Sequence, residues 1–89
     1  MTIKELAKNI KTTSEIIDIA VWDREKETRE YVLCFTDYSL QEMIRIISKD
    51  ENDERKKYLN YEIEDIDVYT SGDGAVTLIE IVKGDNNNE

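Results

Sequence analysis

The chain has 89 residues, of which 39% are hydrophobic and 37% are charged, and its 21 acidic and 12 basic side chains give a formal net charge of −9. This length supports one small domain with a modest core. The absence of proline, with only three glycines and one cysteine, excludes collagen-like repeats, low-complexity linkers and a disulfide framework.

The first predicted element is a short helix from Ile3 to Lys11. Thr2 and Glu5 have the spacing of a capping box, and apolar residues then recur with the period of a helix. Residues 12–14 form a polar break. A strand rich in β-branched residues is predicted next, from Glu15 to Trp22, with a core face made of Ile17, Ile19 and Val21.

A hairpin and a second helix follow. A charged connector at residues 23–28 leads to a second predicted strand from Arg29 to Thr36, which pairs with the first. Ser39 and Glu42 repeat the capping-box spacing. The apolar stripe of the helix that they begin consists of Leu40, Met43, Ile44 and Ile47.

The second half begins with the polar residues 48–57, for which we predict a loop and a short helix. Residues 61–70 alternate as a strand does, but their two halves are out of phase, which predicts a bulge or a break near Glu64. Residues 71–74 predict a turn, and residues 75–82 a closing strand with Thr77, Ile79 and Ile81 on one face. Residues 84–89 are expected to be a disordered tail.

These elements predict a single α+β domain over residues 1–83, in the order α-β-β-α-β-β. Two hairpins would form a four-stranded antiparallel sheet with one or two helices on one face. The other face carries partly apolar residues as well, among them Trp22.

The composition argues against an enzyme. Without histidine, the usual general base and the commonest metal ligand are missing. An EF-hand-like calcium loop is disfavoured because Arg55 stands where that loop needs glycine. We therefore predict a non-enzymatic protein with no catalytic residue, no cofactor and no metal site.

The lone Cys34 lies in an apolar run and is expected to be a small buried hydrophobe, which fits a reducing compartment. No apolar run reaches the length of a membrane span, and residues 1–5 lack the hydrophobic region of a signal peptide. We expect a cytoplasmic protein that does not bind membranes.

The negative charge is concentrated in the second half. Residues 1–11 hold three basic and one acidic side chain, residues 12–49 hold five and eight, and residues 50–89 hold four and twelve. A solvated surface would account for this excess without any partner. The candidate contact residues are the carboxylates in its densest parts, namely Asp50, Glu51, Asp53, Glu54, Glu62, Glu64, Asp65 and Asp67.

Regularly spaced carboxylates can take the place of nucleic-acid phosphates. In a strand, residues two apart lie on one face about 6.6 Å from each other, as Asp65 and Asp67 would. Such a row, continued by the acidic residues 50–54, would fit a groove that neutralises phosphates. We therefore predict a basic, nucleic-acid-binding protein as partner, with no direct binding to nucleic acid.

An alternative interface is the apolar outer face of the sheet, where Trp22 and Tyr69 would anchor a homodimer or another partner. In this second interpretation the chain is a structural or regulatory interaction protein. The acidic residues would then serve solubility alone.

The opening residues 2–6, the two-hairpin plan and the acidic segment 61–69 resemble the small acidic proteins carried by phages and mobile elements of Gram-positive bacteria. Some of these are anti-CRISPR inhibitors that occupy the nucleic-acid channel of a Cas nuclease. The resemblance implies an inhibitor that acts in the host cytoplasm. The resemblance covers the whole chain in size and style, but it assigns no functional role to any particular residue.

Overall fold

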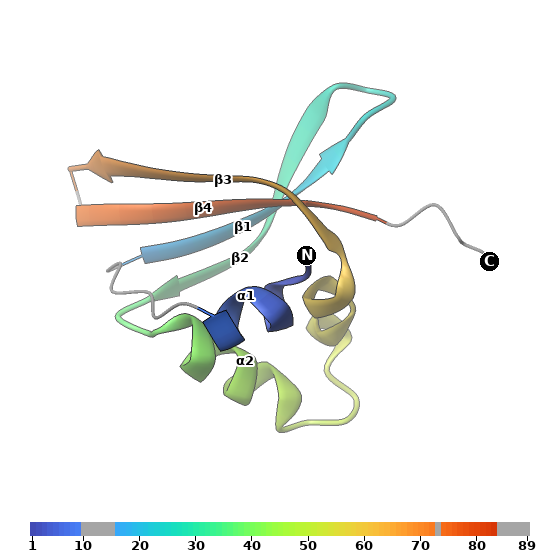
Figure 1. Ribbon diagram of the computed structural model, residues 1–89, viewed down its shortest axis with the longest axis vertical. Coiled ribbons are helices and arrows are strands. Elements are labelled where there is room, and N and C mark those ends of the chain that lie inside the picture. The colour runs from blue at the N-terminus through green and yellow to red at the C-terminus, as the bar shows by residue number, and fades with distance from the viewer. Residues whose placement is uncertain (10–15, 73, 84–89) are drawn as a thin grey trace.

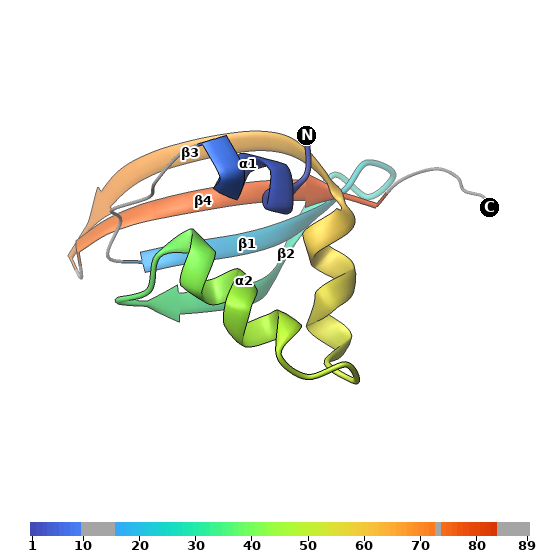
Figure 2. The same ribbon diagram turned by 60° about the horizontal axis from the view of Figure 1, so that its bottom comes forward.

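The computed structural model describes residues 1–9, 16–72 and 74–83. Within them, three helices lie against one face of a four-stranded sheet (Figures 1 and 2). The α+β class and the predicted order of elements are confirmed. The predicted helix end at Lys11, strand start at Glu15 and tail at residues 84–89 lie outside the described residues. The elements are α1 (Ile3–Asn9), β1 (Ile16–Asp23), β2 (Thr28–Thr36), α2 (Leu40–Ser48), the 3-10 helix η1 (Glu54–Asn60), β3 (Glu62–Ser71) and β4 (Gly74–Val82).

Both predicted capping boxes are present. At the start of α1, the Thr2 amide donates to Glu5 Oε1 at 2.9 Å, and the Glu5 amide donates to Thr2 Oγ1 at 3.3 Å. At the start of α2, the Ser39 amide donates to Glu42 Oε1 and the Glu42 amide donates to Ser39 Oγ, both at 3.1 Å. Each box satisfies backbone N–H groups that have no partner within the first helical turn.

The polar segment 48–57 contains the end of α2, a loop and the start of η1. Asp53 caps η1, because its carboxylate accepts a hydrogen bond from the Arg55 amide at 2.9 Å. Leu59 is fully buried and anchors η1 to the core. The predicted loop and short helix are confirmed.

The strands are ordered β2-β1-β4-β3. The β1–β2 and β3–β4 hairpins are antiparallel as predicted, but β1 and β4 run parallel, so the sheet is mixed. Between the hairpins, α2 and η1 carry the chain across one face of the sheet to its far edge (Figure 2). This crossover sets the parallel direction of the middle pair. Apart from Asp18 and Glu80, both middle strands are largely apolar on two faces, as buried parallel strands usually are.

The predicted irregularity near Glu64 is confirmed as a bulge. The β3–β4 register shifts between Ile63 and Asp65. The extra residue corrects the phase of the strand, so Ile63 and Ile66 lie on one face although they are three residues apart.

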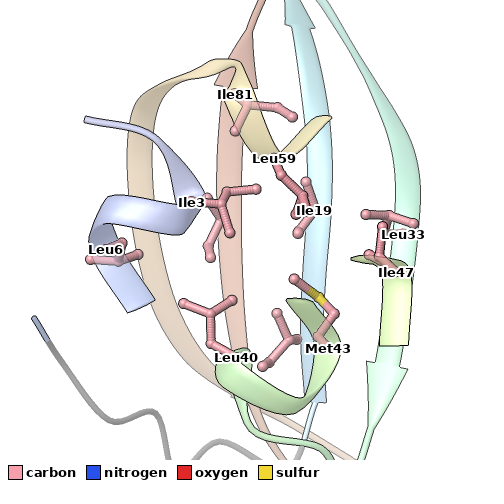
Figure 3. Close-up of a cluster of buried hydrophobic side chains, with 11 residues drawn as sticks. Ile3, Leu6, Ile19, Leu33, Leu40, Met43, Ile47, Leu59 and Ile81 are labelled. Carbon is pink, nitrogen blue, oxygen red and sulfur yellow. The ribbon is translucent and has the colours of Figure 1, made fainter. Parts of the chain in front are cut away.

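The core lies between the helices and the sheet. The predicted face of β1 supplies Ile17 and Ile19, and the register places them beside Thr77 and Ile79 of β4. Figure 3 shows the helix side chains directed toward these strands. The buried cluster consists of Ile3, Leu6, Ile17, Ile19, Leu33, Leu40, Met43, Ile47, Leu59, Ile79 and Ile81.

Two neighbouring isoleucines of α2 test this packing. Ile47 is fully buried, whereas Ile46 is 38% exposed. We expect Ile47→Ala to lower the free energy of unfolding by about 2–5 kcal/mol, because it leaves a cavity in the core. Ile46→Ala should change it by less than about 1 kcal/mol. Urea unfolding measures both values, and similar losses for the two variants would contradict the orientation of α2.

Candidate functional site

The face of the sheet opposite the helices is the candidate site, and we call it the open face (Figure 1). Two cross-strand rows follow from the register, each in the order β2, β1, β4, β3. These rows are Tyr31, Ala20, Glu80, Asp65 and Cys34, Asp18, Leu78, Asp67.

The floor of the open face is apolar and buried. Ala20, Val76 and Leu78 are nearly inaccessible, yet they do not belong to the cluster under the helices. Because no described helix covers this face, larger neighbours in the same face must shield them. Tyr31 and Tyr69 are such neighbours, and both keep an exposed part. The open face therefore combines a small apolar floor with aromatic side chains that a partner can reach.

Arg29 links two strands across the open face. Its Nε donates to Glu80 Oε2 at 2.9 Å, and its Nη1 donates to the Tyr31 hydroxyl at 3.4 Å. These contacts, with Tyr31 the larger cause and Glu80 the next, raise the pKa of Arg29. Asp65 lies directly opposite Glu80, and like charges so placed repel each other. The Arg29 guanidinium offsets this repulsion at Glu80, whereas Asp65 stays exposed.

A hollow of about 350 Å³ lies on this part of the open face. It is open to solvent and mixes charged groups with one aromatic ring. Its lining residues are Trp22, Arg29, Glu64, Asp65 and Glu80.

Tyr69 lies in a negative environment. Burial is the main cause that raises the pKa of its hydroxyl, followed by the nearby Tyr31, Asp18 and Asp67. Like any tyrosine hydroxyl, it is protonated at neutral pH and can donate a hydrogen bond.

Cys34 is exposed, so the prediction that it is buried was wrong. Alternation along β2 directs Leu33 into the core and turns Cys34 to the open face. Its hydrogen bond to Asp18, together with partial burial, raises the pKa of the thiol. Since the thiolate is the reactive form, Cys34 is a weaker nucleophile than an ordinary exposed cysteine.

Among the predicted contact residues, Asp65 and Asp67 share the open face, as expected. Glu62 and Glu64 do not form the second pair that an unbroken strand would give, because Glu64 is the bulged residue. Both are engaged elsewhere. Glu62 accepts from the amino group of Met1 at 2.8 Å, and Glu64 accepts from Arg24 at 2.9 Å.

The acidic residues 50–54 lie away from Asp65 and Asp67. They form the turn between α2 and η1 and the first residue of η1 on the helix side of the sheet, and the rest of η1 separates them from β3 (Figure 1). Asp50 accepts from the Asn52 amide at 2.9 Å, and Asp53 binds Arg55 through both carboxylate oxygens. Glu51 on this turn and Glu54 at the start of η1 are exposed. The expectation that this segment continues the carboxylate row of β3 was wrong.

The alternative interface residues both belong to the open face, at opposite ends. Trp22 lies beyond Ala20 near the end of β1, and Tyr69 pairs with Val76 near the start of β4. Four further residues of the open face were not predicted from the sequence, namely Asp18, Arg29, Tyr31 and Glu80. Asp18 and Glu80 alternate with core residues in the sequence. Arg29 and Tyr31 instead have the same parity as the core residue Leu33, and the register shift between Ile19 and Ala20 is what turns them to the open face. The order of strands then brings the four side chains together.

Comparison with family models, curated proteins and solved structures found no match to this chain. Within the described residues, no group of three or more metal-ligating side chains is placed to hold a metal ion. In the same part of the chain, no helix is long and apolar enough to cross a membrane.

The contact between Asp18 and Cys34 can be tested by thiol labelling. Asp18→Asn removes the negative charge that stabilises the protonated thiol, so the pKa of Cys34 should fall. We expect iodoacetamide to label the folded variant several-fold faster than the wild type at pH 8. Asp67→Asn, on the same face, is the control and should label at the wild-type rate. Equal rates for wild type and Asp18→Asn would contradict the contact.

The Asp53–Arg55 pair predicts a dependence of stability on acid. Hydrogen bonds from the Arg55 side chain and amide lower the pKa of Asp53 from 3.8 to about 2. Because the folded pKa is depressed, the pair stabilises the fold above about pH 4, and this stabilisation is lost as the pH falls through 2.

Asp53→Asn retains a capping side chain but removes the charge. The melting temperature of the variant should therefore lie below that of the wild type at pH 6, and the two should converge near pH 2. Glu54→Gln, at the next position, should show no such convergence. A difference between wild type and Asp53→Asn that persists at pH 2 would count against the ion pair.

Proposed function

We propose that this chain is a non-enzymatic acidic binding protein whose open face binds a basic partner. The observation that carries the proposal is the charge of that face. Asp18, Asp65 and Asp67 bring carboxylates from two strands, and Glu80 brings one from a third. An opposing guanidinium on this face, that of Arg29, is already engaged by Glu80. The proposal assigns no catalytic residue and no cofactor.

The partner that this charge suits best is a nucleic-acid-binding protein. A groove that binds phosphates presents basic side chains at regular intervals. Asp65 and Asp67 lie on one face about 6.6 Å apart, and Asp18 lies in the same cross-strand row as Asp67. Carboxylates in such a groove would replace phosphates and inhibit the partner. The resemblance to anti-CRISPR proteins suggests a Cas nuclease as one such partner.

The apolar part of the open face supports an interaction beyond charge alone. Trp22 and Tyr69 are aromatic residues of the kind that carry binding energy at interfaces. A homodimer through this face is disfavoured, because two copies would bring carboxylates against carboxylates. Charge and aromatic content together favour a basic protein over a second copy.

The proposal is tested by inhibition of purified nucleic-acid-binding proteins, including a Cas nuclease loaded with its guide RNA. Displacement of a labelled oligonucleotide is measured with increasing amounts of this protein. Asp65→Lys combined with Asp67→Lys should weaken inhibition by roughly tenfold or more. The wild-type effect should also fall steeply as salt is raised.

Glu51→Lys combined with Glu54→Lys is the matched control, since it changes net charge equally at the turn on the helix side. It should weaken inhibition by less than about threefold. Equal losses from the two double variants would mean that only net charge matters and would overturn the open-face assignment. Failure to displace oligonucleotide from any tested protein would overturn the choice of partner class.

A second candidate function is that of a structural or regulatory interaction protein, favoured by the apolar floor under Trp22 and Tyr69. The partner would then contact aromatic side chains and not the carboxylates. Trp22→Ala should abolish such binding, whereas Asp65→Lys with Asp67→Lys should leave it intact. The opposite pattern would reject this candidate.

A further inference from the structure

β3 is an edge strand of the sheet. It pairs with β4 on one side. On its other side, the described contacts are at its beginning, where Thr2 bridges Glu62 and the Met1 carbonyl accepts from the Ile63 amide at 2.7 Å. Among the described residues, the stretch from Asp65 to Thr70 has no second strand beside it. An edge of this kind can accept an extended chain as a further strand.

The register shows which backbone groups face outward. Ser71 and Gly74 are paired across a two-residue connection, so they exchange hydrogen bonds with each other. Hydrogen-bonded and non-bonded positions alternate from there along an antiparallel pair. Asp65, Asp67 and Tyr69 thus direct their N–H and C=O groups toward β4. The groups that point outward belong to Ile66, Val68 and Thr70.

The side chains along the same edge alternate between apolar and acidic. Ile66 is 41% exposed and Val68 is 65% exposed, and both lie on the helix side of the sheet. Asp65 and Asp67 lie on the open face. An added strand would meet apolar residues on the helix side of the sheet and carboxylates on the open face.

We propose that the β3 edge, from Asp65 to Thr70, binds an extended segment of the basic partner by strand addition. That segment would alternate basic and apolar residues, with the basic ones opposite Asp65 and Asp67 and the apolar ones opposite Ile66 and Val68. This inference rests on the proposed function and adds the way in which the partner is bound.

Two features of the sheet favour a basic segment over other occupants. A second copy of β3 would place its own acidic residues along the same edge, and like charges on neighbouring strands destabilise pairing. The other edge strand, β2, carries Arg29 next to Glu30 and so lacks the single sign of charge found on β3. The β3 edge therefore favours a segment that is both extended and positively charged.

The test compares the binding of two capped peptides of identical composition to the full protein. One peptide has the sequence Lys-Val-Lys-Ile-Lys-Val, and the other groups its lysines at one end. Fluorescence anisotropy at low ionic strength should give at least tenfold tighter binding for the alternating peptide. Asp65→Lys with Asp67→Lys should remove the binding of both peptides.

Val68→Pro separates strand addition from charge attraction. The substitution removes a backbone N–H that points outward, so the pairing of β3 with β4 is kept. Val68→Pro should weaken binding of the alternating peptide tenfold or more. Val68→Thr, which keeps the N–H, should change this binding by less than threefold. Equal binding by wild type and Val68→Pro would overturn strand addition and leave the basic-partner proposal standing.

Amide exchange gives a second readout that needs no variant. The alternating peptide should slow hydrogen exchange at Ile66, Val68 and Thr70, while Asp65 and Asp67, already bonded to β4, should change little. Unchanged exchange at the three outward amides would overturn the inference even if Val68→Pro fails to fold. If neither peptide binds at low ionic strength, the basic-partner proposal itself fails.

Discussion

The parallel pairing of β1 with β4 is the constraint on which the rest of the molecule depends. It aligns two strands that are largely apolar on both faces, so Ile19 and Ile79 meet the helices while Ala20 and Leu78 line the opposite face. It also leaves β2 and β3 at the edges of the sheet. A small domain thereby obtains one core beneath the helices and a second, thinner apolar layer that no described helix covers.

The bulge at Glu64 determines how the acidic residues of β3 are used. The extra residue lets Ile63 and Ile66 share the helix side, which keeps Asp65 and Asp67 together on the open face. The bulged Glu64 is instead held by Arg24. Carboxylates that are close in sequence therefore divide into residues bound within the protein and residues that a partner can reach.

The sequence predicted those features that depend on local chemistry. The capping boxes of Thr2 and Ser39, the two hairpins and the bulge follow from residue spacing over a few positions, and all are present. The parallel middle pair could not be predicted, because hairpin signals do not say which strands meet at the centre of a sheet. Without that pairing, the row that joins Asp18 to Asp67 was not foreseen. Cys34 was placed in the core for a different reason, because its apolar neighbours in the sequence do not share its face of β2.

We expect a basic partner to bind the open face and the adjoining β3 edge. Amide chemical shifts of this protein, followed by NMR while an inhibited nucleic-acid-binding protein is added, locate the contact directly. We expect the changes to gather at Asp18, Asp65, Asp67 and Tyr69. Changes confined to residues 50–54, or to the exposed side of α2, would contradict the claim.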